Sequence, residues 1–362
     1  MTASRRLLST PTGPLVVWCA SRMAVAIAVL VAATSWLRGW YHWDVALYIK
    51  VAQYGYGGYP DHYPDQGIAA FFPGLPLTLR LVHVLVGNWV WCGLIVSAIA
   101  GAVAVTALAR ITELEAPRGA GTWAVLALVL SPYAVFLAAG YSEALFLAFA
   151  LPAWLAARRR SWLAAGLLAA AASTVRVTGL FLAVALIVEY LTAHRRLRAD
   201  VAWLLLPAIP LGLFVVHLHH VLGDWRAWSH AEERMWGRTF TAPWDALQTT
   251  WDAATASGVQ SDYAWQFRAD IAAIGLGLVL TIVLLAWSRW AEATYVGLQV
   301  VALGTSSFYL SVGRATLLWF PLWVLLGKLA VKHKSLFAVY VIVATPLMFA
   351  QTVGFVTGDW VG

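Results

Sequence analysis

Eleven apolar stretches follow one another along this chain of 362 residues. They cover approximately residues 14–37, 88–109, 121–139, 142–157, 161–175, 177–192, 201–222, 270–287, 292–312, 315–331 and 335–356. A transmembrane helix needs about 20 apolar residues. A soluble domain would carry about 25% charged residues, whereas this chain carries 11%. We therefore expect an all-α polytopic membrane protein of about eleven transmembrane helices, built as a single integral membrane domain over residues 1–362.

Two details of this span assignment matter for the topology. Residues 161–175 and 177–192, on either side of Arg176, are short for two crossings, so one re-entrant hairpin is an alternative. The first stretch follows Arg5 and Arg6 and is too long for the core of a signal peptide. We expect it to be retained as the first span.

The basic residues indicate how the spans are oriented. With the N-terminus in the cytoplasm, fourteen of the 24 Lys and Arg residues, but only five of the 17 acids, fall on the cytoplasmic side. Every short cytoplasmic turn is then basic, as the positive-inside rule expects. Arg22, inside the first span, is expected to extend toward the cytoplasmic headgroups.

The same orientation places two long loops, residues 38–87 and 223–269, on the extracytoplasmic side. Loops usually carry the functional groups of a scaffold, so we expect the active face there. Residues 45–54 predict an amphipathic interfacial helix with Leu47, Val51 and Tyr54 on its apolar stripe. Gly55 is expected to end that helix.

Asp44 precedes the predicted interfacial helix. Its carboxylate suits either of two roles: an N-cap that accepts a backbone N–H, or a catalytic base where lipid and water meet. The neighbouring His42 is either an ordinary interfacial histidine or a group that tunes Asp44 or binds a sugar.

Several segments together resemble the PIG-V-like mannosyltransferases, which belong to the GT-C superfamily of polytopic glycosyltransferases. The resemblance begins in the first loop and continues in order over most of the chain. Its residues are His42-Trp43-Asp44, Tyr48, Gly55-Tyr56, Phe71-Phe72-Pro73-Gly74-Leu75-Pro76, Ala139-Gly140-Tyr141-Ser142-Glu143, Arg176-Val177-Thr178-Gly179, Gly223-Asp224-Trp225, Ser311-Val312-Gly313-Arg314 and Phe320-Pro321-Leu322. The late segment has Arg314-Ala315 where the family usually has an arginine–tyrosine pair.

The resemblance implies a specific activity. Enzymes of this superfamily transfer a sugar from a polyprenyl-phosphate carrier to a hydroxyl on the outer leaflet, and an acidic residue of the first outer loop is essential. Asp44 matches that acid. The expected donor is a polyprenyl-phosphate sugar, with mannose as the sugar, and the expected acceptor is a glycolipid or glycan. The resemblance also implies a multi-pass protein of a bacterial plasma membrane, with its active site facing outward among membrane lipids.

An inverting displacement at the anomeric carbon needs one base and positive charge for the departing phosphate. Arg314 and Arg176, in outer turns, are the first candidates for contacts with the donor phosphate, and snorkelling to headgroups is the alternative for each. Lys50 and Arg80 are weaker candidates, because both lie on surface-like stretches. No metal and no cofactor is expected.

Aromatic and acidic residues are the candidates for sugar or acceptor contacts. Glu143 opens an apolar segment, where the helix dipole alone would also favour an acid. The complete set of predicted contacts is His42, Trp43, Tyr48, Tyr141, Glu143, Trp228 and Trp236.

The second loop excludes two other kinds of site. It has four basic residues against six acids, so it is not a nucleic-acid-binding surface. His217, His219 and His220 lack an accompanying carboxylate at ligand spacing, which argues against a metal site.

Two alternatives to an enzyme remain: a transporter or flippase of a lipid-linked sugar, and a non-catalytic subunit of a membrane glycosylation complex. A transporter would carry ionisable residues within its spans, whereas most charges here lie at span ends. The acceptor, the linkage position and the oligomeric state do not follow from the sequence.

Overall fold

The computed structural model describes residues 12–58, 67–194, 198–256 and 263–362. Within these residues every regular secondary-structure element is a helix. The β-type pairing among them is one isolated bridge between Phe240 and Ser306. The expected all-α membrane protein is confirmed. The chain forms two compact units: residues 1–46, 81–161 and 317–361 make unit 1, and residues 47–80, 162–316 and 362 make unit 2.

A helix lies at each of the eleven predicted spans, but the count of eleven crossings is not confirmed. Among the described residues, five helices are long and apolar enough to cross a membrane alone. A sixth crossing is possible if Val312–Leu318 and Phe320–Lys332, bent by 70°, count as one span. The five helices are α2 (Gly13–Ala32), α5 (Trp89–Glu113), the stretch Ala199–Leu222, α13 (Ala264–Ala286) and α17 (Lys334–Thr357).

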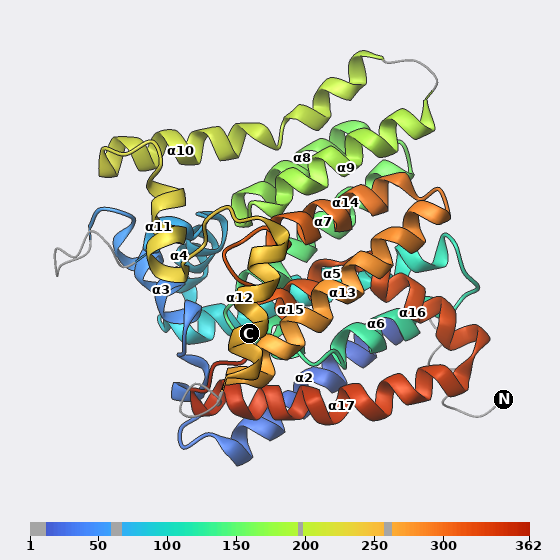
Figure 1. Cartoon of the computed structure of the whole chain (residues 1–362), viewed down its shortest axis with the longest axis horizontal. Helices are drawn as coiled ribbons and strands as arrows, with labels where there is room; N and C mark the ends of the chain where they lie inside the picture. The colour runs from blue at the N-terminus through green and yellow to red at the C-terminus, as the bar shows by residue number, and fades with distance from the viewer. Residues whose placement is uncertain (1–11, 59–66, 195–197, 257–262) are drawn as a thin grey trace. The chain divides into compact units, whose positions relative to one another are not determined.

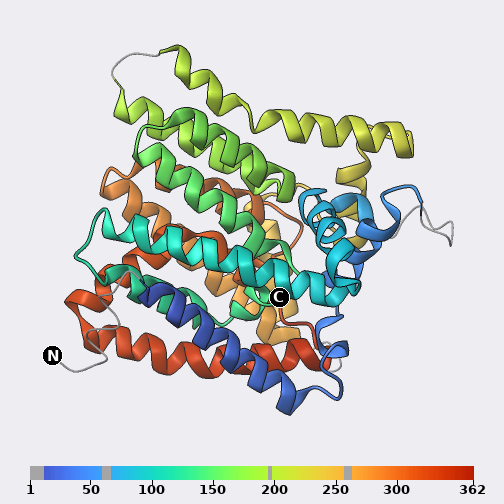
Figure 2. The same ribbon diagram turned by 180° about the vertical axis from the view of Figure 1, so that it is seen from behind.

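Unit 1 is a bundle of long helices. Figure 1 shows α17 and α2 side by side, and Figure 2 shows α2 from the other side, where it packs on α5 and α6. The remaining elements of unit 1 are η1 (Arg38–Trp40), α6 (Ala120–Val129), η3 (Ala134–Leu137), α7 (Ser142–Arg158) and α16 (Phe320–Lys332). The predicted span 121–139 is therefore interrupted after Val129.

Small residues bring the helices of unit 1 close together. A Cβ added to Gly93 of α5 would lie 2.9 Å from the Cα of Gly140, just before α7. Trp18 of α2 fits over Gly101 of α5 and donates its indole N–H to the carbonyl of Ala98 at 3.1 Å. Close backbone approach of this kind replaces the hydrophobic driving force that lipid-embedded helices lack.

Unit 2 contains the second long loop and, among the shorter apolar helices, α8 and α9. Its elements are η2 (Ile68–Ala70), α8 (Trp162–Val175), α9 (Thr178–Ala193), η4 (Ala199–Leu205), α10 (Ala208–Leu222), α11 (Ala227–Trp236), α12 (Pro243–Thr255), α13, α14 (Trp290–Gly304) and α15 (Val312–Ala315). Helix α14 packs against both α9 and α13, and α12 packs on α13 (Figure 1). The loop predicted at 223–269 thus contains two helices, α11 and α12.

Two helices of the first loop run from one unit into the other. Helix α3 (Asp44–Tyr54) matches the predicted amphipathic helix, and Gly55 ends it with a φ of +70° and an N–H bonded to the carbonyl of Val51. The buried stripe differs in part from the predicted one: Val51 is buried as predicted, but Tyr54 is 43% exposed, and Tyr48 and Ala52 are buried instead. Helix α4 (Gly74–Val86) was not predicted, since its apolar residues were assigned to the loop.

Candidate functional site

Asp44 is the first residue of α3, and the preceding backbone turns sharply to place it there. Trp43 has a φ of +53°, a left-handed conformation that non-glycine residues rarely adopt. The indole N–H of Trp43 donates to the backbone carbonyl of Asp359 at 3.2 Å. The Asp44 N–H donates to the hydroxyl of Tyr141 at 3.3 Å. Asp44 itself is half-buried, so its position is fixed while part of the residue stays accessible.

Tyr141 and Glu143 stand at the beginning of α7, in the same unit as Asp44. Tyr141 is 2% exposed, and its ring packs against Phe136 and Phe355. Glu143 is fully buried in the first turn of α7, where the positive end of the helix dipole favours a carboxylate. The structure therefore brings Asp44 next to Tyr141, two predicted site residues that are 97 positions apart.

His42 lies against the end of α17. Its ring meets the ring of Phe355 edge-on, with centroids 6.3 Å apart. A Cβ added to Gly358, which has a φ of +96°, would lie 3.4 Å from the imidazole. The turn after α17 thus borders the His42–Asp44 segment on one side.

In unit 2 the first loop packs against the second through aromatic rings. Tyr48 meets Phe71 edge-on at 4.7 Å, and Phe71 in turn meets Trp236 of α11 at 5.6 Å. Trp228, near the beginning of α11, packs against Phe72 with ring centroids 6.3 Å apart. Three predicted sugar contacts therefore share one aromatic cluster with the Phe71-Phe72 pair.

Two further contacts fix the end of α3. The Tyr56 hydroxyl donates to the carbonyl of Phe71 at 2.6 Å, and burial raises the pKa of this phenol, with a smaller contribution from Tyr48. The Arg80 Nε–H donates to the carbonyl of Ala52. Arg80 thus binds the C-terminal end of α3, where a cation is favoured by the helix dipole. Lys50, on the same helix, is half-buried.

The two first candidates for contacts with a phosphate, Arg176 and Arg314, lie in separate segments of unit 2. Arg176 joins α8 to α9 and is half-buried; its carbonyl accepts the N–H of Gly179 at 3.0 Å. Arg314 is the third residue of the short helix α15 and is also half-buried.

Asp270 is a residue of this region that the sequence analysis missed. It lies in the apolar helix α13, is 2% exposed, and accepts the backbone N–H groups of Ser311 at 3.1 Å and Gly313 at 2.8 Å. No motif marks it. A carboxylate within a predicted span is itself the signal that could have identified it, because an ionisable group there is expensive to bury.

The turn between α10 and α11 contains an ordered acid–histidine pair. Asp224 accepts the backbone N–H of Arg226 at 2.8 Å and lies 2.7 Å from Nδ1 of His230. These two hydrogen bonds, the backbone one first, lower the pKa of Asp224. Nearby, His219 stacks on Trp225 with centroids 3.8 Å apart. Among the described residues no three His, Cys, Asp or Glu side chains form a metal-binding group.

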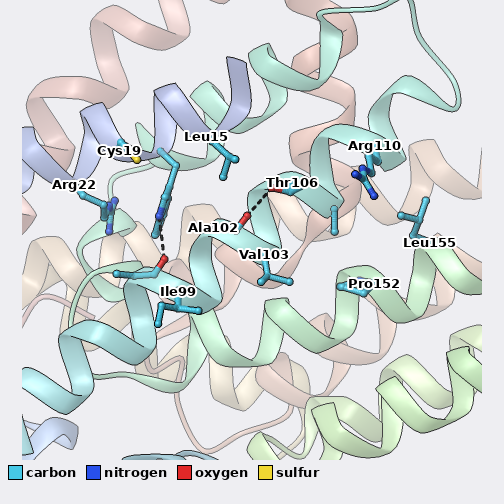
Figure 3. A pocket seen from close by; sticks show the side chains of 13 residues that line it. Leu15, Cys19, Arg22, Ile99, Ala102, Val103, Thr106, Arg110, Pro152 and Leu155 are labelled. Atoms are coloured by element: carbon cyan, nitrogen blue, oxygen red, sulfur yellow. Dashed lines mark hydrogen bonds between the residues drawn. The ribbon is translucent and has the colours of Figure 1, made fainter. Parts of the chain in front are cut away.

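A hollow of about 840 Å³ lies in unit 1 between α2, α5 and α7 (Figure 3). Its lining is almost wholly apolar, with Trp18, Arg22 and Arg110 among its walls, and none of the predicted site residues lines it. Arg22, which is expected to extend toward the cytoplasmic headgroups, lies in the wall of this hollow. Its guanidinium stacks 4.2 Å over the Trp18 ring, and both terminal nitrogens are buried.

Comparisons with known proteins match part of this chain. A family described as "Mannosyltransferase (PIG-V)" matches residues 6–199. The chain is similar to GPI alpha-1,6-mannosyltransferase 2 of Cricetulus griseus, with 38% identity over 174 residues, and to its counterpart from Mus musculus, with 36% identity over 179 residues.

These alignments cover 44% and 45% of this chain, and the chain spans about a third of the length of either relative, 33% and 34%. The family match extends further and covers more than half of the residues. It includes the His42–Asp44 segment, Tyr141, Glu143 and Arg176. The chain therefore belongs to the PIG-V mannosyltransferase family.

Proposed function

We propose that this protein is an inverting mannosyltransferase. It moves mannose from a polyprenyl-phosphate carrier to a hydroxyl of a glycolipid or glycan on the extracytoplasmic side of the membrane. The observation that carries this proposal is the family match over residues 6–199, within which Asp44 heads α3 and is bonded through its N–H to Tyr141.

In the proposed reaction Asp44 is the general base. It takes the proton of the acceptor hydroxyl while the oxygen attacks the anomeric carbon, and the bond from that carbon to the phosphate oxygen breaks. The leaving lipid phosphate is already an anion, so no second carboxyl group is needed to protonate it, in contrast to glycoside hydrolysis. Arg314 and Arg176 supply positive charge to the departing phosphate.

The stereochemistry of the reaction constrains the donor. The curated relatives are named for an α linkage. An inverting displacement that forms an α linkage requires a donor whose sugar is joined to phosphate in the β configuration. We therefore propose a β-linked polyprenyl-phosphate mannose as the donor, with His42, Trp43, Glu143 and the aromatic cluster of Tyr48, Trp228 and Trp236 contacting the sugar or the acceptor.

The test is replacement of Asp44 by Asn, which keeps the shape of the side chain and removes the base. Loss of a general base lowers turnover by about 10²- to 10⁴-fold. The assay follows the formation of a mannosyl–acceptor bond from purified polyprenyl-phosphate mannose. The matched control is Asp252→Asn on α12, whose exposed carboxylate accepts a hydrogen bond from Gln248. Normal turnover in a folded Asp44→Asn protein would overturn the assignment.

The same preparation distinguishes the alternatives. In proteoliposomes, a flippase would move the lipid-linked sugar between leaflets without forming a new glycosidic bond. A non-catalytic subunit would show neither flux nor transfer when it is purified alone.

A further inference from the structure

The buried carboxylate of Asp270 holds the backbone that carries Arg314. Asp270 is the seventh residue of α13, and each of its two oxygens accepts a different N–H. Oδ2 lies 3.1 Å from the nitrogen of Ser311, and Oδ1 lies 2.8 Å from the nitrogen of Gly313. These two amides flank Val312, and Arg314 follows directly.

The conformation of the backbone at Ser311 and α15 explains why a hydrogen-bond acceptor is needed there. Ser311 has a φ of +59°, a left-handed conformation that residues with a side chain rarely adopt. It directly precedes α15, a helix of four residues that cannot satisfy its own first N–H groups. A carboxylate that accepts two N–H groups here both compensates the unfavourable conformation and caps the short helix.

The residues before Ser311 are held by the second long loop of the same unit. Arg238 donates to the carbonyl of Leu310 at 3.2 Å, and the Tyr309 N–H donates to the hydroxyl of Thr250 at 2.8 Å. The segment is therefore fixed along its length, and Asp270 fixes the part that adjoins Arg314.

We propose that Asp270 is a positioning residue for donor binding. It does not touch the donor; it fixes the backbone of residues 311–313 so that the Arg314 guanidinium is already oriented for the lipid phosphate. This inference rests on the proposed function, in which Arg314 contacts that phosphate. Fixing a binding group in advance improves affinity, because less conformational freedom is lost on binding.

The central variant is Asp270→Asn. One oxygen still accepts, but the amide NH₂ now faces a backbone N–H, so one of the two hydrogen bonds is lost. Hydrogen bonds to charged groups contribute enough that we expect about a 10- to 100-fold loss in kcat/KM for the polyprenyl-phosphate donor. The loss is expected as a raised donor KM, with the acceptor KM unchanged. Asp252→Asn on α12 again serves as the control.

A double-mutant cycle tests whether Asp270 acts through Arg314. Arg314→Ala should raise the donor KM, and adding Asp270→Asn to it should cause no further loss. Ser311→Gly in the Asp270→Asn protein should recover part of the loss, because glycine adopts a positive φ without strain. If the Asp270→Asn protein does not fold, Asp270→Glu is measured in its place. This second variant keeps the charge and both acceptor oxygens.

Each outcome distinguishes this inference from the proposed function. Binding of a sugar-free polyprenyl phosphate to protein in nanodiscs is measured beside the kinetics. If Arg314→Ala weakens binding but neither Asp270 variant does, or if the two losses add, the inference fails and the proposed function stands. If Arg314→Ala binds and turns over normally, the phosphate role of Arg314 and the inference both fail. If the wild-type protein neither binds nor transfers, the proposed function fails with them.

Discussion

Tyr141 joins two parts of the family motif that lie far apart in the chain. Its hydroxyl accepts the N–H of Asp44, and its ring is enclosed by Phe136 and Phe355. The ring therefore provides packing and the hydroxyl provides orientation, so a substitution that removes only the oxygen separates the two contributions.

We expect Tyr141→Phe to lower turnover about 10-fold while it changes the melting temperature little. A hydrogen bond of this kind contributes about 0.5–1.5 kcal/mol. The substitution removes the oxygen that accepts the N–H of Asp44, the proposed base. Tyr340→Phe is the matched control, since the Tyr340 hydroxyl donates to the carbonyl of Ala127 elsewhere in unit 1. Equal losses of turnover in the two variants would show that Tyr141 only supports folding.

At this scale the sequence predicts residues that belong to a motif and misses those that do not. Asp44 and Glu143 could be proposed as site residues because each is an isolated acid next to an apolar segment. The bond between Asp44 and Tyr141 could not, because it depends on how two distant segments pack. Asp270 was missed because its partners are backbone N–H groups, which every residue except proline possesses.

Among the elements, the contact between α5 and α7 depends on two glycines. A Cβ on Gly93 would come within 2.9 Å of the Gly140 Cα, and backbone cannot move aside as a flexible side chain can. Gly140 directly precedes Tyr141, so a displacement of α7 at this point also moves the hydroxyl that holds Asp44.

We expect Gly93→Ala to destabilise the protein by about 1–3 kcal/mol, the usual cost of overpacking, and to lower turnover as well. Thermal unfolding in detergent and the transfer assay measure the two effects. Gly212→Ala on α10 is the control, because a Cβ there meets nothing within 4 Å and alanine favours the helix. Unchanged unfolding of Gly93→Ala would mean that the two helices can separate without cost.

The Asp224 turn between α10 and α11 predicts a pH dependence of stability. Hydrogen bonds from the Arg226 N–H and from His230 lower the pKa of Asp224. The contribution of Asp224 to the free energy of unfolding is therefore complete above the ordinary carboxyl pKa of about 3.9. It is lost as the pH falls through the lower pKa that Asp224 has in the folded protein.

Thermal unfolding of wild type and Asp224→Asn, measured between pH 6 and pH 3, tests this sign. The wild type should be the more stable protein at pH 6, and the difference should shrink as the pH falls. Asp252→Asn should show no comparable convergence. A difference that grows on acidification would contradict the assigned contacts.

Element positions were largely predictable, whereas buried faces were not. A helix lies at each apolar stretch because about 20 apolar residues in lipid must satisfy their backbone groups internally. The stripe of α3 was displaced, with Tyr54 exposed and Tyr48 buried, because the neighbours of an interfacial helix decide which face is covered. Helix α4 was missed since its 13 residues are too few for a span.

For the molecule as a whole, the direction of the chain through the membrane decides where the proposed chemistry occurs. The predicted orientation of the spans rests on the excess of Lys and Arg in the short turns, which the positive-inside rule places in the cytoplasm. It predicts that residues 38–87 and 223–269 are extracytoplasmic. The opposite orientation would place Asp44 in the cytoplasm, where an acceptor of the outer leaflet could not reach it.

Labelling of single cysteines tests this orientation. Arg226, just before α11, and Arg159, just after α7, are both exposed, so a cysteine at either position is open to reagent. Cys19 is exposed and is replaced by Ser, whereas Cys92 is buried and can remain. In intact cells a membrane-impermeant maleimide should label Arg226→Cys but not Arg159→Cys, and in inverted vesicles the preference should reverse. Labelling of Arg159→Cys in intact cells would instead place both long loops on the cytoplasmic side and exclude an outer-leaflet acceptor.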